Sequence, residues 1–205
     1  MTDIDSIIDL LDWKRRVFAL YATVRNDPSP ALAWQRWRAR RDELFRTHPQ
    51  SPIAHTQRQI FTRLDLFEYD PTFRVLATVE PAEQKTYDVP TSGDETFTFT
   101  RSGTARFELL DTEQMLELYW LTAYGGGLFV PFRDETSGMR TYGAGRYLLD
   151  TIKGADLGME GEKLVLDFNF AYNPSCSYDP KWVCPLAPPP NRLGLEITAG
   201  EKHSS

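Results

Sequence analysis

Cysteine and histidine are scarce in this sequence. Its 205 residues include two cysteines, Cys176 and Cys184, and three histidines, His48, His55 and His203. Two cysteines exclude a scaffold held together by several disulfides. A four-ligand metal site built on them would need two further ligands, and the histidines stand at no recognisable ligand spacing. The sequence therefore identifies no set of metal ligands.

The chain also lacks a long apolar run and an excess of positive charge. No stretch approaches the roughly 20 apolar residues that a membrane-spanning helix needs. Residues 1–16, MTDIDSIIDLLDWKRR, place acids before the apolar residues and offer no small-residue cleavage site, unlike a secretory signal. The net charge of −6 argues against nucleic acid or an anionic membrane as the main partner. We therefore expect a cytoplasmic protein, and its oligomeric state stays open.

Two amphipathic helices are predicted near the N-terminus. Apolar side chains recur at helical spacing through residues 3–25. A second helix is expected to begin with Ser29 as its cap and Pro30 at its first position, and to end at His48. Several arginines, Arg41 among them, stand between its apolar positions. We interpret them as a solvated face, although a basic amphipathic helix also suits an acidic partner.

From Phe61 onward the apolar residues alternate with a period of two, which is typical of strands. Strands are expected at residues 74–79, 96–101, 105–110, 115–121, 128–132, 147–152 and 164–173. Ser102-Gly103 is interpreted as a tight hairpin turn. The predicted fold is mainly β (α+β). Residues 59–205 form an antiparallel curled sheet or barrel, and residues 1–58 supply two N-terminal helices that pack on it.

The strand predicted at residues 164–173 carries a polar stripe. Every second residue from Leu164 to Tyr172 is apolar, so Asp167, Asn169 and Asn173 share the other face. One interpretation is that this face meets water, as antiparallel sheets commonly allow. The other is that the stripe lines a concave interior or supports the loop that follows.

That loop is rich in proline and contains both cysteines. Six prolines between residues 174 and 190 restrict its backbone. Tyr178, Trp182 and Val183 give it apolar surface to bury, which predicts an ordered loop that is functional or packs as a unit. Cys176 and Cys184 have three interpretations: buried structural thiols, a disulfide or redox pair, and metal ligands.

A second segment, residues 131–150 (PFRDETSGMRTYGAGRYLLD), collects polar residues between glycines. Gly143-Ala144-Gly145 lacks the third glycine of a dinucleotide fingerprint, and no helix is expected after it. The glycines are interpreted as tight turns and bulges in a twisted sheet. Arg133 and Arg146 could each present a planar donor fork to a carboxylate of a ligand or of the protein itself. No cofactor is identified.

Three segments resemble a bacterial and archaeal family known only as a domain of unknown function. They are residues 131–150, residues 166–193 (LDFNFAYNPSCSYDPKWVCPLAPPPNRL) and the closing AGE at residues 199–201. The family typically shows a DxTSGxxTYxxGRYL-like segment, then LDFNxAYNPxCxY, CPLPPxxNRL and AGE. Ala187 stands where the family more often has proline. The resemblance extends from about Phe61 to Glu201. It implies one β-rich domain and carries no activity, substrate or cofactor.

Three functions are compatible with these features. We expect a small-molecule-binding β-barrel whose pocket is walled by residues 163–173 and roofed by the two motif loops. The candidate residues for a small polar ligand are Arg133, Tyr142, Arg146, Asp167, Asn169, Asn173, Tyr178 and Arg192. Alternatively, these residues form an internal polar network that only locks the C-terminal loop. A hydrolase-like enzyme with Asp167 and Glu201 as acid and base is the third reading. A cavity among these groups would favour binding, and a packed interior would favour the network.

Overall fold

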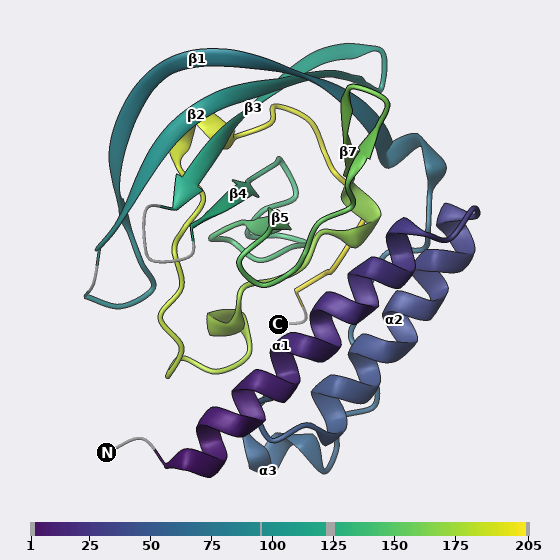
Figure 1. Cartoon of the computed structure of the whole chain (residues 1–205), viewed down its shortest axis with the longest axis vertical. Helices are drawn as coiled ribbons and strands as arrows, with labels where there is room; N and C mark the ends of the chain where they lie inside the picture. Colours follow the sequence, from purple (N-terminus) through teal and green to yellow (C-terminus); the bar gives the residue numbers. More distant parts are fainter. Residues whose placement is uncertain (1–2, 95, 122–125, 204–205) are drawn as a thin grey trace.

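The computed structural model describes residues 3–94, 96–121 and 126–203, and in it a strongly curled sheet packs against two long helices (Figure 1). The helices are α1 (Ile4–Arg25), α2 (Pro30–Thr47) and α3 (His55–Arg58), with 3-10 turns η1 (Pro71–Phe73), η2 (Phe168–Phe170), η3 (Ser175–Ser177) and η4 (Pro189–Asn191). The strands are β1 (Arg74–Pro90), β2 (Thr96–Leu109), β3 (Thr112–Leu121), β4 (Gly127–Phe132), β5 (Arg146–Asp150), β6 (Met159–Glu160) and β7 (Lys163–Asp167).

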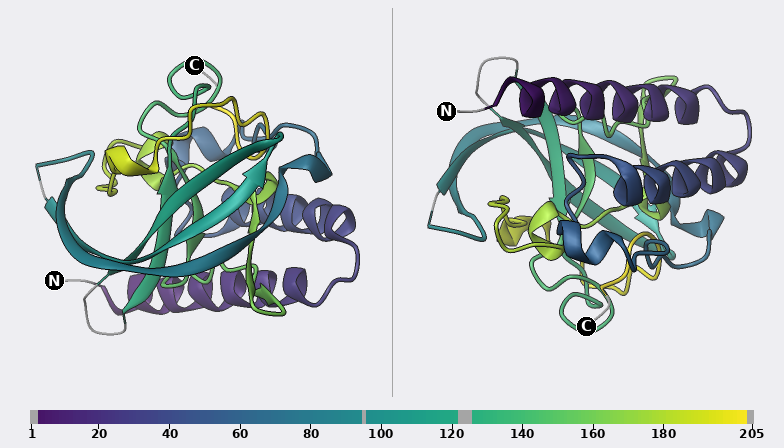
Figure 2. Two further views of the ribbon diagram at one scale, coloured as in Figure 1. Left: turned by 90° about the horizontal axis from the view of Figure 1, so that it is seen from above. Right: turned by 90° about the horizontal axis from the view of Figure 1, so that it is seen from below.

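The strands form one antiparallel sheet in the order β5-β4-β3-β2-β1-β7-β6. The long strands β1 and β2 arch over one side, and α1 and α2 lie side by side on the other (Figure 2). The fold is mainly β as predicted, and of the two predicted forms, a curled sheet or a barrel, the described residues form the curled sheet, which is not closed. The edge strand β5 meets the chain beyond the end of β7 at an isolated bridge, where Tyr147 and Tyr172 exchange backbone hydrogen bonds of 2.9 and 3.1 Å. No ladder extends from it, because the chain has left extended geometry at η2.

The strand predicted at residues 164–173 ends early. β7 stops at Asp167, whose carboxylate accepts a hydrogen bond of 3.0 Å from the Asn169 backbone N–H and so caps η2. Residues 164–174 are all buried, on both sides of the chain. The interpretation that this polar stripe faces water is therefore wrong. A 3-10 turn replaces the strand here, so side chains two residues apart no longer share a face. The polar side chains therefore have different partners, which holds for Asp167, Asn169 and Asn173.

The hairpin predicted at Ser102-Gly103 is also wrong. β2 runs straight through these residues, with a register shift between Arg101 and Gly103. Gly103 is required there because a Cβ would lie 2.8 Å from the Glu80 carbonyl oxygen on β1. The tight turn follows at Leu110 and Asp111, whose φ angles of 51° and 57° suit the hairpin between β2 and β3.

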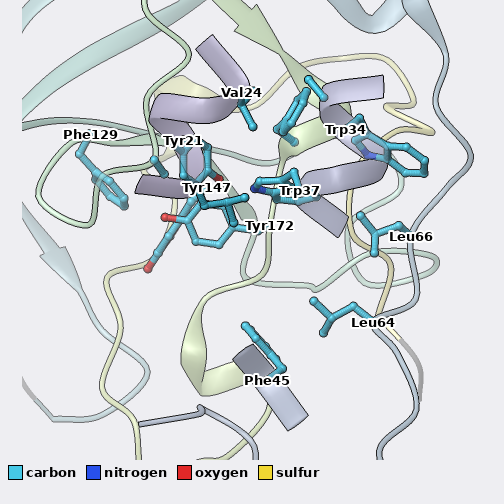
Figure 3. Packing of buried hydrophobic residues seen from close by; sticks show 14 of the residues in the cluster. Tyr21, Val24, Trp34, Trp37, Phe45, Leu64, Leu66, Phe129, Tyr147 and Tyr172 are labelled. Carbon is cyan, nitrogen blue, oxygen red and sulfur yellow. The ribbon is translucent and has the colours of Figure 1, made fainter. Parts of the chain in front are cut away.

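The two predicted helices are confirmed, and aromatic residues attach α2 to the chain after β7 (Figure 3). The Trp37 ring packs edge-on against Phe170 with centroids 5.1 Å apart, and the Trp34 indole donates to the Asn169 carbonyl at 3.0 Å. Ser29 occupies the cap position of α2 without the expected side-chain hydrogen bond. Among the described residues, no helix is long and apolar enough to cross a membrane.

Candidate functional site

The residues predicted to bind a ligand do not converge on one pocket. Asn173 and Tyr178 border one cavity, and Asp167 borders a second. Tyr142 lies beside Cys176, with its hydroxyl 3.7 Å from the sulfur. The other four residues contact protein groups or solvent. Each group of residues can therefore be assigned its own role.

Arg146 is fully buried and holds the C-terminal segment in place. One guanidinium nitrogen donates to Asp134 at 2.9 Å and to the Ile197 carbonyl at 3.0 Å, and the other donates to the Ala199 carbonyl. The Arg146 and Asp134 side chains are each only 1% exposed. Burial lowers the pKa of Arg146, and the nearby carboxylate of Asp134 opposes this effect. Arg146 thus binds the protein's own groups, as the network alternative expects.

Asn169 also bonds only protein groups. Its amide nitrogen donates to the carbonyl of Asp70 and to the carboxylate of Asp167, each at 2.8 Å, and its oxygen accepts from the Asp70 N–H at 2.9 Å. Asn169 therefore ties η1 to η2. The other oxygen of Asp167 is buried and has no hydrogen-bond partner in the described chain, with Arg74 Nε 3.9 Å away. Burial raises the pKa of Asp167 to about 6.

Arg133 and Arg192 lie on adjacent segments bridged in parallel. Arg192 is exposed and pairs with Glu135 at 3.3 Å. Arg133 is half-buried, and its Nε has no partner among the residues that the structure describes. Neither arginine borders the cavities of Asn173 and Asp167.

A partly open cavity of about 70 Å³ lies between the helices and the proline-rich loop, and we call it the Arg41 cavity. Its walls combine aromatic rings with a few polar groups. The lining residues are Trp13, Val17, Tyr21, Arg41, Phe45, Pro52, Lys153, Ala155, Tyr172, Asn173, Ser175 and Tyr178.

The guanidinium of Arg41 lies among aromatic rings at the centre of this site. It stacks over Trp37, Phe45 and Tyr172 at 4.9, 4.9 and 5.1 Å from the ring centroids. It also pairs with Glu201 at 3.1 Å, where the arginine is 12% and the glutamate 2% exposed. Such stacking together with a buried carboxylate fixes the guanidinium plane.

Glu201 is held by three groups that converge on its carboxylate. Arg41 supplies one, the Asn173 backbone N–H donates to Oε2 at 3.1 Å, and the Tyr178 hydroxyl donates to Oε1. Burial raises the pKa of Glu201, and Arg41 and Tyr178 oppose this rise. Burial together with the Glu201 charge raises the pKa of Tyr178. Both carboxylate oxygens of Glu201 thus accept hydrogen bonds from protein donors.

Three buried polar atoms on residues that line the cavity lack a hydrogen-bond partner in the described structure. They are Nε of Arg41, the hydroxyl of Tyr172 and Oδ1 of Asn173. The amide nitrogen of Asn173 is occupied, because it donates to the Lys202 carbonyl at 2.8 Å. Buried polar groups are normally paired, and leaving one unpaired costs about 1–3 kcal/mol. Three such atoms at one cavity indicate a place for a polar molecule.

Reasoning from the sequence missed Arg41 and Tyr172. Arg41 was assigned to a solvated face of the second helix, yet it follows Trp37 by four residues and precedes Phe45 by four. These three positions share one helix face, so a charge inside a buried aromatic stripe was the available signal. Tyr172 was counted as an apolar strand residue, and only the position of its hydroxyl distinguishes it.

The predicted acid–base pair is not brought together. Asp167 pairs with Arg74 on β1, whereas Glu201 pairs with Arg41 on α2. In the part of the chain that the structure describes, the two carboxylates have no contact and no common partner.

Comparison with known proteins gives a family and a fold. A solution NMR structure of an uncharacterized protein from gene locus rrnAC0354 of Haloarcula marismortui is 38% identical, with a TM-score of 0.59, over 82% of this chain and 91% of that one. No curated protein matches the chain. Residues 59–202 match the family model described as "Protein of unknown function (DUF1684)". The chain therefore belongs to the DUF1684 family, as its motifs predicted.

Proposed function

We propose that this protein binds a small polar molecule in the Arg41 cavity. The observation that carries the proposal is the set of unpaired buried atoms on Arg41, Tyr172 and Asn173, three residues that line the same cavity. Buried atoms without a partner also occur elsewhere among the described residues, for example Nε of Arg146 and Oδ2 of Asp167, but these three lie on residues that line one cavity. Ligand sites in proteins typically combine apolar walls with a few convergent polar groups.

The free atoms define the chemistry of the ligand. Arg41 Nε and the Tyr172 hydroxyl can donate, and Asn173 Oδ1 can only accept. A matching ligand needs an oxygen acceptor, such as a carbonyl or carboxylate, and close to it a hydroxyl or N–H donor. The surrounding rings favour a planar or partly apolar body. Small hydroxy acids and amides meet these requirements.

The volume limits the size of the ligand. A cavity must have a volume of about 10–15 Å³ to hold one water molecule. A cavity of about 70 Å³ therefore has room for a ligand of a few non-hydrogen atoms. Lys153, which is half-exposed and 3.7 Å from Asp150, also lines this space and offers a cation to an anionic ligand.

A larger apolar side chain that fills the cavity tests this proposal and leaves the polar groups of the cavity unchanged. Val17 lines the cavity from α1 and is half-buried. We expect native mass spectrometry of the full chain, purified from its own host or mixed with small hydroxy acids and amides, to show a retained small molecule. Val17→Phe should abolish this retention, and the matched variant Val17→Ala should keep it. Equal retention by both variants would place any ligand elsewhere.

The network alternative describes other residues better. Protein groups accept the hydrogen bonds that the side chains of Arg146, Asn169 and Asn191 donate. Asn191, for example, donates to the carbonyls of Glu117 and Pro131 at 3.0 and 2.8 Å. We assign these residues to fixing the loops that enclose the cavity. A cytoplasmic location and the lack of a nucleic-acid partner stay predictions from the sequence.

A further inference from the structure

Cys176 and Cys184 lie against each other at the base of the proline-rich loop. Both are free thiols, and the Cys176 backbone N–H donates to the Cys184 sulfur at 3.4 Å. Cys176 is half-buried in η3, whereas Cys184 is only 4% exposed. An oxidant in solution can therefore reach Cys176 more easily than Cys184.

The backbone holds Cys184 in a fixed position. The Ser92 N–H donates to the Cys184 carbonyl at 3.0 Å, and the Cys184 N–H donates to the Ser92 hydroxyl oxygen at 3.1 Å. A neighbouring bridge joins Thr91 to Pro185. Cys176 lies in a separate short turn, whose Tyr178 N–H bonds back to Ser175 at 3.1 Å. The two thiols are thus kept in contact by different segments.

The surroundings of Cys176 favour its thiolate. The Cys184 thiol acts as a donor toward it, and the hydroxyls of Ser92 and Tyr142 add to this effect, so the pKa of Cys176 falls to about 6 against the opposing effect of burial. The hydrogen bond to Cys176 and burial raise the pKa of Cys184, and the Cys176 charge adds to this rise. Burial raises the pKa of Tyr142 to about 12, so its hydroxyl stays a donor at neutral pH. Thiolates, not thiols, are the nucleophiles in cysteine chemistry.

We propose that Cys176 and Cys184 form a hydroperoxide-reactive dithiol, in which the half-buried Cys176 is oxidised first and the buried Cys184 resolves it. In the first step the Cys176 thiolate attacks one peroxide oxygen. The S–O bond forms, the O–O bond breaks, and the leaving oxygen departs as hydroxide or alkoxide. In the second step the Cys184 sulfur attacks the sulfenic sulfur of Cys176. A disulfide forms, and the sulfenic oxygen leaves as water with the Cys184 proton.

The two sulfurs have unequal roles for a physical reason. The first step needs access and a thiolate, which Cys176 has. The second step needs a nearby sulfur held in place, which Ser92 provides by fixing Cys184. Two inert packed thiols would instead have both sulfurs enclosed and neither stabilised as a thiolate.

Hydrogen peroxide applied to the reduced full-length chain tests this assignment. We expect the intact mass to fall by two hydrogens, and a dithiol reductant to restore it. Cys184→Ser should stop at a sulfenic acid that dimedone traps. Cys176→Ser should lose the fast reaction altogether. Circular dichroism of both variants shows whether they fold.

The pH dependence separates this site from ordinary thiols. At pH 6 a thiol with a pKa of about 6 is half ionised, against about 0.3% for a free cysteine of pKa about 8.5. After allowing for the lower nucleophilicity of a weaker base, the folded chain should react about ten-fold faster than the urea-unfolded chain. Equal rates in the folded and unfolded chains, or oxidation of wild type without a disulfide, would overturn the assignment. So would an undiminished rate in Cys176→Ser.

Discussion

Removing the Tyr172 hydroxyl should stabilise the ligand-free protein and weaken ligand binding. The oxygen is buried and has no hydrogen-bond partner among the described residues, so the folded state bears the cost of its desolvation. That cost is about 1–3 kcal/mol for a buried unpaired group. Tyr172→Phe removes the oxygen and keeps the ring. The ring still lies under the Arg41 guanidinium and packs edge-on against Tyr147, with the two ring centroids 5.7 Å apart. We expect a gain of about 1 kcal/mol in the free energy of unfolding, or a rise of roughly 2–4 °C in Tm.

The neighbouring ring provides a matched control. The Tyr147 hydroxyl donates to the Pro185 carbonyl at 2.7 Å, and its ring is buried like that of Tyr172. Tyr147→Phe removes a satisfied hydrogen bond, so this variant should lose about 0.5–1.5 kcal/mol. The two substitutions change the same atom type in the same core and should change stability in opposite directions.

Urea denaturation of both variants measures the effect, after any retained molecule has been removed by unfolding and refolding. Ligand capture is then compared by native mass spectrometry. Without the hydroxyl donor, Tyr172→Phe should bind about two- to ten-fold more weakly, corresponding to one ordinary hydrogen bond. If Tyr172→Phe were destabilised as much as Tyr147→Phe, the hydroxyl would have a protein partner. The cavity would then be part of the network, and the reasoning would be wrong.

Further predictions concern the fixed parts of the fold and one carboxyl group. Arg146→Met should cost about 3–5 kcal/mol in urea denaturation because it leaves the buried Asp134 carboxylate unpaired; a cost below 1 kcal/mol would contradict this. Burial raises the pKa of Asp167 to about 6, against about 3.9 when unfolded, so its stabilising contribution is complete below about pH 4 and is lost as the pH rises through 6. The wild-type advantage over Asp167→Asn should therefore fall by about 2 kcal/mol between pH 4 and pH 7, and a difference independent of pH would refute it. Gly200 has φ +77° and a Cβ there would lie 2.6 Å from two carbonyl oxygens, so Gly200→Ala should lower the free energy of unfolding by about 2 kcal/mol or more. The control Gly194→Ala, where a Cβ meets nothing within 4 Å, should have little effect on Tm.

Local patterns predicted most of the elements. The period of 3.6 located both long helices, and the period of two located the strands, because each depends on which neighbours along the chain share a face. The same rule failed at residues 168–173. There the Asp167 side chain caps a 3-10 turn, and a side-chain hydrogen bond to the backbone overrides an apolar alternation. It failed again at Gly103, where close approach of β1 demands a glycine inside a strand rather than in a turn.

The candidate site was predicted in part. Asn173 and Tyr178 do border a cavity, and Tyr178 in the proline-rich loop packs edge-on against Phe45. The place of Arg41 in an aromatic helix face was a signal in the sequence, but its contact with the C-terminal segment could not be predicted, because α2 is far from the motifs along the chain. Its pairing partner Glu201 is 160 positions away. Arg146 and Asn169 looked like ligand contacts because an arginine fork or an amide suits a protein carbonyl as well as a ligand oxygen.

The amino-acid sequence alone determined the family, the α+β class, the two helices and the antiparallel strands, because these depend on periodicity and on short motifs. Only the tertiary structure decided which polar atoms find partners. Hydrogen bonds are satisfied by whichever groups the fold brings within about 3 Å, and sequence distance does not report that separation. The unpaired atoms around Arg41, and the contact between Cys176 and Cys184, therefore became visible only once the helices and the C-terminal loop were packed together.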